Sequence, residues 1–386
     1  MDKFWETIVK FFQESGIAGF FQNGGWMNLI MIVLALILMF LAIKKDFEPY
    51  LLLPISFGML LVNIPLAGKE LFVVDEAGNY SGLLGYLYYG VKLGIYPCLI
   101  FLCIGATTDF GPLIANKKTM LLGGAAQLGI FITFIGAILL KFTPQQASAI
   151  GIIGGADGPT AILVTTKLAP ELLASISIAA YSYMALVPII QPPIIRAMTT
   201  KKERSIKMDD SVREVSKRER IMFPIIVTLV VILLVPSCAP LIGCLMLGNL
   251  IKESGVVPKI THTLANGLLY TVTILLGLCV GATANAQTFL SLDTLKIFAL
   301  GIFAFATATA GGVLGGKIMC KVTGGKVNPM IGAAGVSAVP MAARVVHKMG
   351  QKEDPSNFLL MHAMGPNVAG VIGSAVAAGV LLLLFQ

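Results

Sequence analysis

The sequence predicts an all-α protein that crosses a membrane many times, and three observations lead to that prediction. Only 12% of the 386 residues are charged, whereas a soluble domain carries roughly 25%. Long runs such as 26–43 and 221–248 contain no charge, and about 20 apolar residues are enough for one helix to cross a bilayer. Two further apolar segments, 145–167 and 328–348, are interrupted by Gly and Pro, so neither can form one straight helix.

The chain begins with a segment of mixed character. Residues 1–25 alternate charged side chains such as Glu6 and Glu14 with aromatic ones such as Trp5 and Phe11, which predicts an amphipathic helix lying in the membrane interface. About ten transmembrane helices are expected after it. They lie near 26–43, 49–66, 83–106, 119–140, 170–197, 221–235, 237–251, 262–283, 293–315 and 356–385.

The orientation of these helices follows from the distribution of Lys and Arg. The loop 200–220 holds eight basic residues and is therefore expected in the cytoplasm, while the acidic loop around Glu70 and Asp75 is expected outside. Every connector agrees with this orientation only if 145–167 and 328–348 each enter and leave on one side. The sequence thus predicts two re-entrant hairpins, the first entering from outside and the second from inside, with both termini outside.

Three landmarks recur in the second half of the chain at offsets of 176, 180 and 178 residues. Residues 102–107 (LCIGAT) recur as 278–283 (LCVGAT), 155–158 stand opposite 335–338, and 184–188 stand opposite 362–366. Because the predicted topology places the two copies in opposite orientations, they form an inverted repeat. Such repeats hold ion and substrate sites near the bilayer midplane, on discontinuous helices.

The predicted organisation follows from the repeat. It comprises an interfacial helix (1–25), an extra first transmembrane helix (26–48), a first repeat (49–199) with its hairpin 145–167, a basic cytoplasmic loop (200–220), and an extra helix plus second repeat (221–386) with its hairpin 328–348.

Asp157 lies at the centre of the first hairpin, in the run GGADGP. Pro159 and three glycines favour unwound backbone there, and such backbone is tolerated in a membrane only where it is buried in protein or lines a cavity. A carboxylate inside the membrane costs at least about 3 kcal/mol, so it needs a cation, a proton or an Arg partner. The sequence favours a cation site over the alternative, a carboxylate on the hairpin's aqueous rim.

In the second hairpin, Ser337 takes the place of Asp157, so the two halves differ in charge. Arg344 follows seven residues later and has two interpretations. It is either a basic residue that extends to the cytoplasmic interface beside His347 and Lys348, or a planar fork for a carboxylate. Residue chemistry alone does not separate them.

Two further polar residues fall in helices that match each other in the repeat. Asn367 follows Gly-Pro in the last span and offers an amide, and Tyr183 places a phenol at the corresponding depth of the first half. A tyrosine in a transmembrane helix is more often a packing residue or an interface anchor.

Several function classes are excluded or disfavoured. The net charge of +8 comes from basic residues in short connectors, which is a topology signal and not a nucleic-acid surface. The six cysteines form no CxxC pair and the three histidines have no metal-ligand spacing. There is no phosphate-binding loop, dinucleotide fingerprint or Ser/His/Asp arrangement.

Residues 154–160 (GGADGPT) and 328–344 (NPMIGAAGVSAVPMAAR) closely resemble the β subunit of sodium-pumping decarboxylases, which serve oxaloacetate, methylmalonyl-CoA, glutaconyl-CoA and malonate decarboxylase complexes. The resemblance runs from about Trp26 to the C-terminus. It implies a fold similar to elevator-type transporters, with a scaffold and a moving core that holds both hairpins, in the cytoplasmic (inner) membrane of a bacterium or archaeon.

The resemblance also implies a function. In this family a carboxyltransferase α subunit moves a carboxyl group onto biotin on a carrier subunit, and the β subunit decarboxylates that carboxybiotin and exports Na⁺ while an external proton is consumed. Further implied partners are a small membrane γ or δ subunit, the lipid bilayer, and other copies of the chain in a homo-oligomer.

The resemblance assigns roles to six residues. It implies Na⁺ ligands at Asp157, Asn328 and Asn367, a second cation or its replacing proton at Ser337 and Tyr183, and the carboxylate of carboxybiotin at Arg344.

Two alternatives are kept at this stage. A Na⁺-coupled secondary transporter of a carboxylate would use the same inverted repeat and broken hairpins, with Arg344 binding the solute. A non-transporting membrane anchor for a soluble complex would leave the intramembrane Asp157 unexplained.

Overall fold

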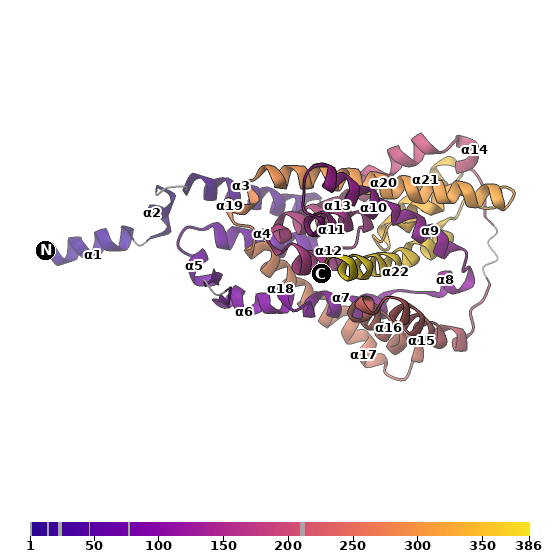
Figure 1. Cartoon of the computed structure of the whole chain (residues 1–386), viewed down its shortest axis with the longest axis horizontal. Coiled ribbons are helices and arrows are strands. Elements are labelled where there is room, and N and C mark those ends of the chain that lie inside the picture. Colours follow the sequence, from indigo (N-terminus) through magenta and orange to yellow (C-terminus); the bar gives the residue numbers. More distant parts are fainter. Residues whose placement is uncertain (1, 14, 22–24, 46, 76–77, 209–212) are drawn as a thin grey trace.

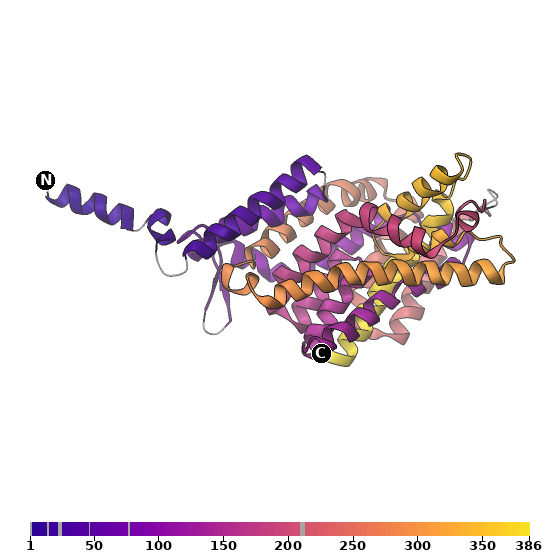
Figure 2. The same cartoon turned by 90° about the horizontal axis from the view of Figure 1, so that it is seen from above.

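The computed structural model describes residues 2–13, 15–21, 25–45, 47–75, 78–208 and 213–386. The described chain is helical apart from one two-stranded antiparallel ribbon, β1 (Val73–Val74) with β2 (Tyr80–Ser81). Its long helices lie roughly along the long axis of an elongated body (Figures 1 and 2). The prediction of an all-α fold is confirmed.

Six continuous helical stretches in the described residues are long and apolar enough to span a membrane. They are α3 (Gly25–Lys45), Thr119–Leu139, Pro170–Met198, Pro258–Ala282, α20 (Leu292–Val322) and α22 (Leu360–Phe385). A seventh span results if α6 (Leu83–Lys92) and α7 (Ile95–Thr107), which bend by 63°, count as one. The multi-pass architecture is confirmed, and the total of ten crossings remains a prediction.

Three further helices account for most of the difference between the ten predicted crossings and the six or seven spans found here. The helices α4 (Pro49–Asn63) and α16 (Ala239–Ser254) are 15 and 16 residues long, and α15 (Lys217–Leu234) begins with four charged residues. Each helix is apolar between its ends, but it is shorter than the roughly 20 residues that an upright crossing needs.

At the N-terminus, α1 (Asp2–Gln13) and α2 (Gly16–Phe20) project from the body in both views (Figures 1 and 2). The side chains of Trp5 and Phe12 are exposed and lie seven residues apart, which places them on one face of α1. Glu14 lies outside the described residues. The placement of this helix in a membrane interface remains a prediction.

Two helix crossings in the body have the same construction. The helix α4 crosses α18 (Leu269–Ala282) at Gly58 and Gly281, and α16 crosses α7 at Gly248 and Gly105. At each of these four glycines an added Cβ would collide with a backbone carbonyl of the opposite helix, so the backbones touch there. The matching hexapeptides lie on α7 and α18. Two repeats related by a two-fold axis would therefore place a glycine contact at both crossings. The repeat and the domain bounds themselves remain predictions.

Both Gly-rich segments break their helices. The first consists of α11 (Pro144–Gly151), a 3₁₀ turn η1 (Ile152–Gly155) and α12 (Gly158–Leu168). Between η1 and α12, Ala156 has a left-handed backbone with φ of 54°, and Asp157 is extended. The second consists of a 3₁₀ segment η5 (Pro329–Gly335) and α21 (Met341–Glu353).

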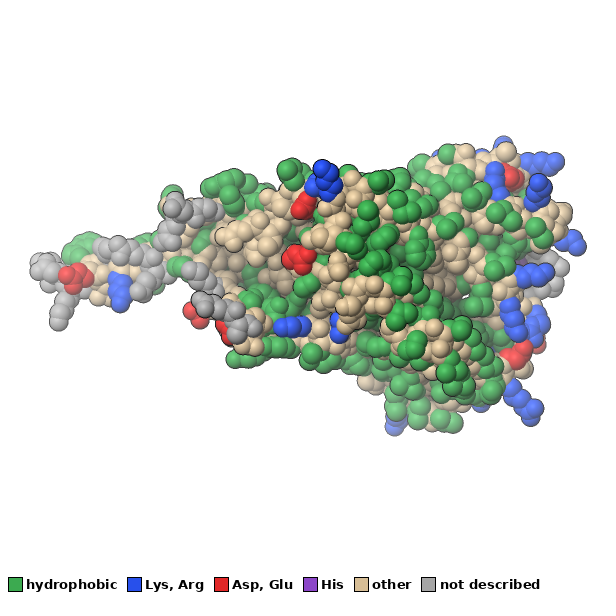
Figure 3. Space-filling model, viewed as in Figure 1, with side chains coloured by type: hydrophobic (Ala, Val, Ile, Leu, Met, Phe, Trp, Pro, Cys, Tyr) green, Lys and Arg blue, Asp and Glu red, His purple; other side chains and the backbone are tan. Residues whose placement is uncertain are grey.

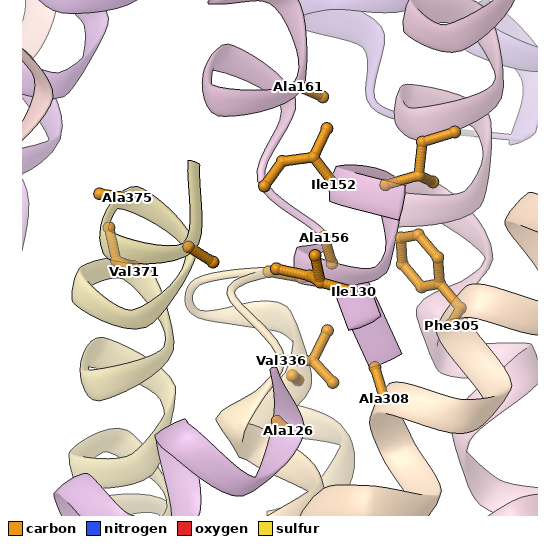
Figure 4. Packing of buried hydrophobic residues seen from close by; sticks show 14 of the residues in the cluster. Ala126, Ile130, Ile152, Ala156, Ala161, Phe305, Ala308, Val336, Val371 and Ala375 are labelled. Carbon is orange, nitrogen blue, oxygen red and sulfur yellow. The ribbon is translucent and has the colours of Figure 1, made fainter. Parts of the chain in front are cut away.

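The two broken segments meet in the interior. The backbone N–H of Ser337 donates to the carbonyl of Gly155 at 3.1 Å. Figure 4 shows Ala156 and Val336, one from each segment, in the same packed cluster as Ile130, between α22 and α20. The core of the protein is therefore built around the two helix breaks.

Charges on the visible surface are segregated. Figure 3 shows Lys and Arg gathered at the end that carries α14 (Lys201–Arg204) and α21, with an apolar belt between the two ends. This segregation is typical of a membrane protein whose basic end faces the cytoplasm.

Candidate cation site at two broken helices

Asp157 is the N-cap of α12 and is only 6% exposed. Its Oδ1 accepts a hydrogen bond from the backbone N–H of Thr160 at 3.2 Å. Its Oδ2 accepts from the hydroxyls of Ser374 at 2.7 Å and Ser337 at 3.4 Å. Among the described residues no Lys, Arg or His forms an ion pair with it. The carboxylate is thus buried and hydrogen-bonded, and it lacks a cationic partner.

The structure joins Asp157 to Ser337, which the resemblance assigned to a second cation, and it adds Ser374, which sequence reasoning missed. Ser374 lies on α22, seven residues after Asn367 and therefore on the same face of that helix. The seven-residue spacing from Asn367, a residue already suspected as a ligand, is the sequence signal that could have identified Ser374.

Asn367 holds the second broken segment next to Ser337. Its Nδ2 donates to the carbonyls of Ala334 at 2.9 Å and Val336 at 2.7 Å. Its Oδ1 is buried and accepts no hydrogen bond. A buried amide oxygen without a partner requires an explanation, such as an ion. Asn367 therefore has the chemistry of a cation ligand close to the Asp157 cluster.

A second amide, on α13 (Leu173–Met198), supports the same segment. The Nε2 of Gln191 donates to the carbonyl of Ala333 at 3.0 Å, and its Oε1 has no hydrogen-bond partner. Gln191 and Asn367 thus bind carbonyls that the broken helix leaves free, so part of the unwound backbone is satisfied by protein.

Asn328 is placed elsewhere. Its Nδ2 donates to the carbonyls of Arg204 at 3.0 Å and Ile206 at 2.9 Å, and its Oδ1 accepts from the N–H of Met330. Asn357 reaches the same two carbonyls of the basic loop. The structure does not bring Asn328 to Asp157, because its Nδ2 binds the basic loop and its Oδ1 caps η5. Its role as a Na⁺ ligand stays a prediction.

Tyr183 also points away from Asp157. Its hydroxyl donates to the carbonyl of Phe298 at 2.6 Å, and its ring packs on Phe298 and Phe305 of α20. The ring of Tyr181 instead lies against Gly158, and its buried hydroxyl has no hydrogen-bond partner. Residues two apart on a helix face nearly opposite directions. Tyr181 is therefore the tyrosine that contacts the first hairpin.

A cavity of about 440 Å³ reaches Asp157 from the end of α7. Thr107 and Asp109 line it, together with Asp157, Ser337 and Pro340 from the two hairpins. Asp109 also borders a neighbouring hollow beside the basic residues Arg213 and Arg220. The cavity thus connects the buried carboxylate with the basic end of the molecule.

Arg344 lies on α21, one turn after Pro340, which lines the cavity. Residues four apart share a helix face, so Arg344 stands beside the cavity mouth. Its side chain is exposed and makes no ion pair or hydrogen bond with another described side chain. A guanidinium in this position is available to a carboxylate ligand.

Two acidic groups at this end have lowered pKa values. Hydrogen bonds from Ser356, together with one from the ammonium of Lys207, lower the pKa of Asp354 to about 2. Partial burial raises the pKa of Glu203, but hydrogen bonds from Thr200 and the nearby Lys317 outweigh it and the pKa is lowered. These pairs fasten α14 to α20 and hold Lys207 against the turn after α21.

Comparison with known proteins identifies the family. Residues 27–385 match the family model described as the Na⁺-transporting oxaloacetate decarboxylase beta subunit. The chain is 56% identical to methylmalonyl-CoA decarboxylase subunit beta of Propionigenium modestum, over 98% of this chain and 99% of that protein. It is 54% identical to glutaconyl-CoA decarboxylase subunit beta of Acidaminococcus fermentans, over 99% and 98%. It is also 51% identical to the oxaloacetate decarboxylase beta chain of Klebsiella pneumoniae, over 92% and 94%.

These matches cover the whole chain and favour a decarboxylase subunit over a Na⁺-coupled secondary transporter or a passive anchor. The resemblance noted in the two motifs is therefore confirmed. The chain belongs to the β-subunit family of Na⁺-transporting decarboxylases, multi-pass membrane subunits in whose complexes decarboxylation is coupled to Na⁺ transport.

Proposed function

We propose that this chain decarboxylates carboxybiotin, presented by a biotin carrier subunit, and couples the reaction to Na⁺ export with uptake of an external proton. One observation carries the proposal. Asp157 is buried between both broken hairpins, with no cationic partner among the described residues, at a cavity that leads to the basic end. Such a carboxylate needs a mobile cation or a proton.

Na⁺ is the cation that the proposal places beside Asp157. The ligands are oxygen atoms: Oδ2 of Asp157, the hydroxyls of Ser337 and Ser374, and the unpartnered Oδ1 of Asn367. Carboxylate, carbonyl and hydroxyl oxygens suit hard cations. When Na⁺ leaves toward the outside, a proton on Asp157 would replace its charge, because an isolated buried carboxylate favours the neutral form.

Arg344 is proposed to bind the carboxylate of carboxybiotin. Its planar guanidinium can donate two parallel hydrogen bonds to a carboxylate, and it stands exposed beside the cavity mouth. Loss of CO₂ breaks the bond between the carboxyl carbon and the ureido nitrogen, and that nitrogen then takes up one proton. The proton consumed in this step is the one that enters from outside and passes the site around Asp157.

The partners follow from the same proposal. They are a carboxyltransferase α subunit, a biotin carrier subunit, a small membrane γ or δ subunit and further copies of this chain, assembled in the cytoplasmic membrane of a bacterium or archaeon. The choice of acid is assigned to the carboxyltransferase. Relatives named for methylmalonyl-CoA, glutaconyl-CoA and oxaloacetate are 56%, 54% and 51% identical to this chain, so similarity to this chain does not single out one acid.

The proposal is tested with Asp157→Asn in the complete complex, reconstituted in proteoliposomes. We expect Na⁺ uptake and Na⁺-dependent decarboxylation both to fall at least about 100-fold, since a neutral amide removes the charge that binds Na⁺. The control is Asp293→Asn, which changes an exposed carboxylate paired with Lys296 and should leave both rates within about twofold. Continued Na⁺ pumping by the Asp157 variant would contradict the proposal.

A second variant separates the binding of Na⁺ from the binding of carboxybiotin. Arg344→Ala should abolish decarboxylation while Na⁺ still binds, measured by calorimetric Na⁺ titration of the purified complex. Lys348→Ala removes an exposed cation one turn further along α21 and should preserve activity. Loss of Na⁺ binding in Arg344→Ala would count against a separate carboxylate role.

A further inference from the structure

An apolar groove runs along the outside of the molecule, between α15 on one side and α8 (Gly111–Ala115), α9 (Thr119–Ala126) and α22 on the other. Its walls include Met222, Ile226 and Val230 of α15 opposite Leu113, Met120 and Ile372. The proposed ion and carboxybiotin sites use none of these residues.

The dimensions of the groove restrict what can occupy it. Its lining extends along α15 from Glu219 to Val231, which is about 18 Å of helix and about half of the 30 Å membrane core. Its volume is about 360 Å³. One extended hydrocarbon chain can lie along a groove of this length.

Two cations flank one end of the groove. Lys117 belongs to its lining, and Arg218 lies one turn before Met222 on α15, above the groove's basic end. Both side chains are exposed, and neither forms an ion pair with another described residue. The nearby Glu219 is already paired with Arg213 at 2.8 Å. The groove therefore ends at two available positive charges on the membrane side that faces the basic loop.

We propose that this groove binds an anionic phospholipid of the leaflet adjoining the loop 200–220, with one acyl chain along α15 and the phosphate between Lys117 and Arg218. A phosphate with Lys and Arg forms strong charge-assisted hydrogen bonds, and cationic residues at a membrane surface attract anionic lipids. The acyl chain would bridge α15 and α22, because Ile372 of α22 belongs to the groove wall. The inference does not depend on the ion or on the reaction.

The test measures lipid retention by the purified complex after extensive washing in detergent, by native mass spectrometry, with added phosphatidylglycerol or phosphatidylcholine as the probe. The wild-type complex should retain phosphatidylglycerol about tenfold better than phosphatidylcholine. The double variant Lys117→Gln/Arg218→Gln should lose this preference. Val230→Trp, which fills the groove, should lose retention of both lipids, while Leu233→Trp, at a 79% exposed position outside the groove, should behave like wild type.

Three results would overturn the inference. They are equal retention of the two lipids by the wild type, an unchanged preference in the charge variant, which alters only exposed side chains, and equal lipid retention in Val230→Trp and Leu233→Trp. Val230→Cys adds a further check in the assembled complex. If it cross-links to a partner subunit, a protein segment occupies the groove and the lipid assignment is wrong.

Discussion

The carboxyl group of Asp157 lies where the described part of the chain supplies hydroxyls and one backbone N–H but no cation. A carboxylate at the membrane centre costs about 2.5–3.5 kcal/mol on insertion scales, and each hydrogen bond to a charged group returns about 1.5–3 kcal/mol. The serines therefore make the carboxylate tolerable without neutralising it. A site of this kind can exchange Na⁺ for a proton, because no described residue beside Asp157 supplies a permanent positive charge.

Ser374 provides a prediction at the level of one hydroxyl. Ser374→Ala removes the 2.7 Å hydrogen bond to Asp157, which is worth about 1.5–3 kcal/mol for a charged partner. If that oxygen also binds Na⁺, the Na⁺ concentration for half-maximal decarboxylation should rise roughly 10- to 100-fold. The measurement is a Na⁺ titration of the decarboxylation rate of the complex.

The matched control is Ser56→Ala. Ser56 is equally buried, but its hydroxyl bonds only to the carbonyl of Leu53 in its own helix. This variant should titrate like wild type. A lower maximal rate of Ser374→Ala with unchanged Na⁺ dependence would show that Ser374 does not bind the ion.

At the scale of elements, the scaffold depends on two backbone contacts between helices. Gly105 and Gly248 bring α7 and α16 together, and Gly58 and Gly281 do the same for α4 and α18. Small residues allow such close packing between membrane helices, where the hydrophobic effect does not drive association. These crossings explain why the hexapeptide motif contains a glycine, Gly105 or Gly281, in both halves.

A pair of glycines on α16 tests this account. Gly248→Ala places a methyl group against the carbonyl of Leu102, and such overpacking costs about 1–3 kcal/mol. Gly243→Ala, five residues earlier on the same helix, meets no atom within 4 Å and should stabilise the helix by up to about 1 kcal/mol. Thermal unfolding of the two purified variants should therefore shift in opposite directions. Equal midpoints would contradict the close crossing.

The elements also explain the position of Asn328. It precedes Pro329, at the start of η5, and serves as the N-cap of that segment. The hydrogen bonds of Asn328 and Asn357 to the carbonyls of Arg204 and Ile206 hold the basic loop to both ends of the second hairpin. The loop that marks the cytoplasmic side is thus fastened to the hairpin that carries Arg344.

The whole molecule combines a one-sided charge distribution with a one-sided cavity. Basic residues gather at the end of α14 and α21 (Figure 3), and the cavity that reaches Asp157 opens beside Thr107 at the same end. In the elevator mechanism implied by the family resemblance, we propose that this arrangement is an inward-facing state in which Na⁺ and carboxybiotin approach from one side.

That sidedness predicts a labelling pattern. Thr107→Cys, at an exposed position in the cavity, should react with a membrane-impermeant maleimide about tenfold faster in inside-out vesicles than in right-side-out vesicles. Asn79→Cys, in the exposed loop between β1 and β2, should show the reverse. Labelling is compared with the parent protein, which contains six native cysteines. Faster labelling of Thr107→Cys from outside would invert the proposed topology.

Much of the architecture could be predicted because it follows from local chemistry. Long uncharged runs indicate a membrane, and the glycines and proline of Gly-Gly-Ala-Asp-Gly-Pro strongly disfavour a continuous helix. The breaks at Asp157 and before Ser337 occur where the sequence places them. The exact number of crossings was less accessible, because α4, α15 and α16 are short or charged at one end.

The sequence by itself determined the membrane class, the two helix breaks and the presence of one expensive carboxylate, since composition and backbone stereochemistry are properties of the chain alone. Only the tertiary structure decided which groups meet Asp157. It brought Ser374 to the carboxylate over 217 residues of chain, placed Tyr181 and not Tyr183 against the first hairpin, and engaged Asn328 with the basic loop. These choices depend on how helices rotate and cross, and a rotation of about 100° per residue changes which side chain faces the site.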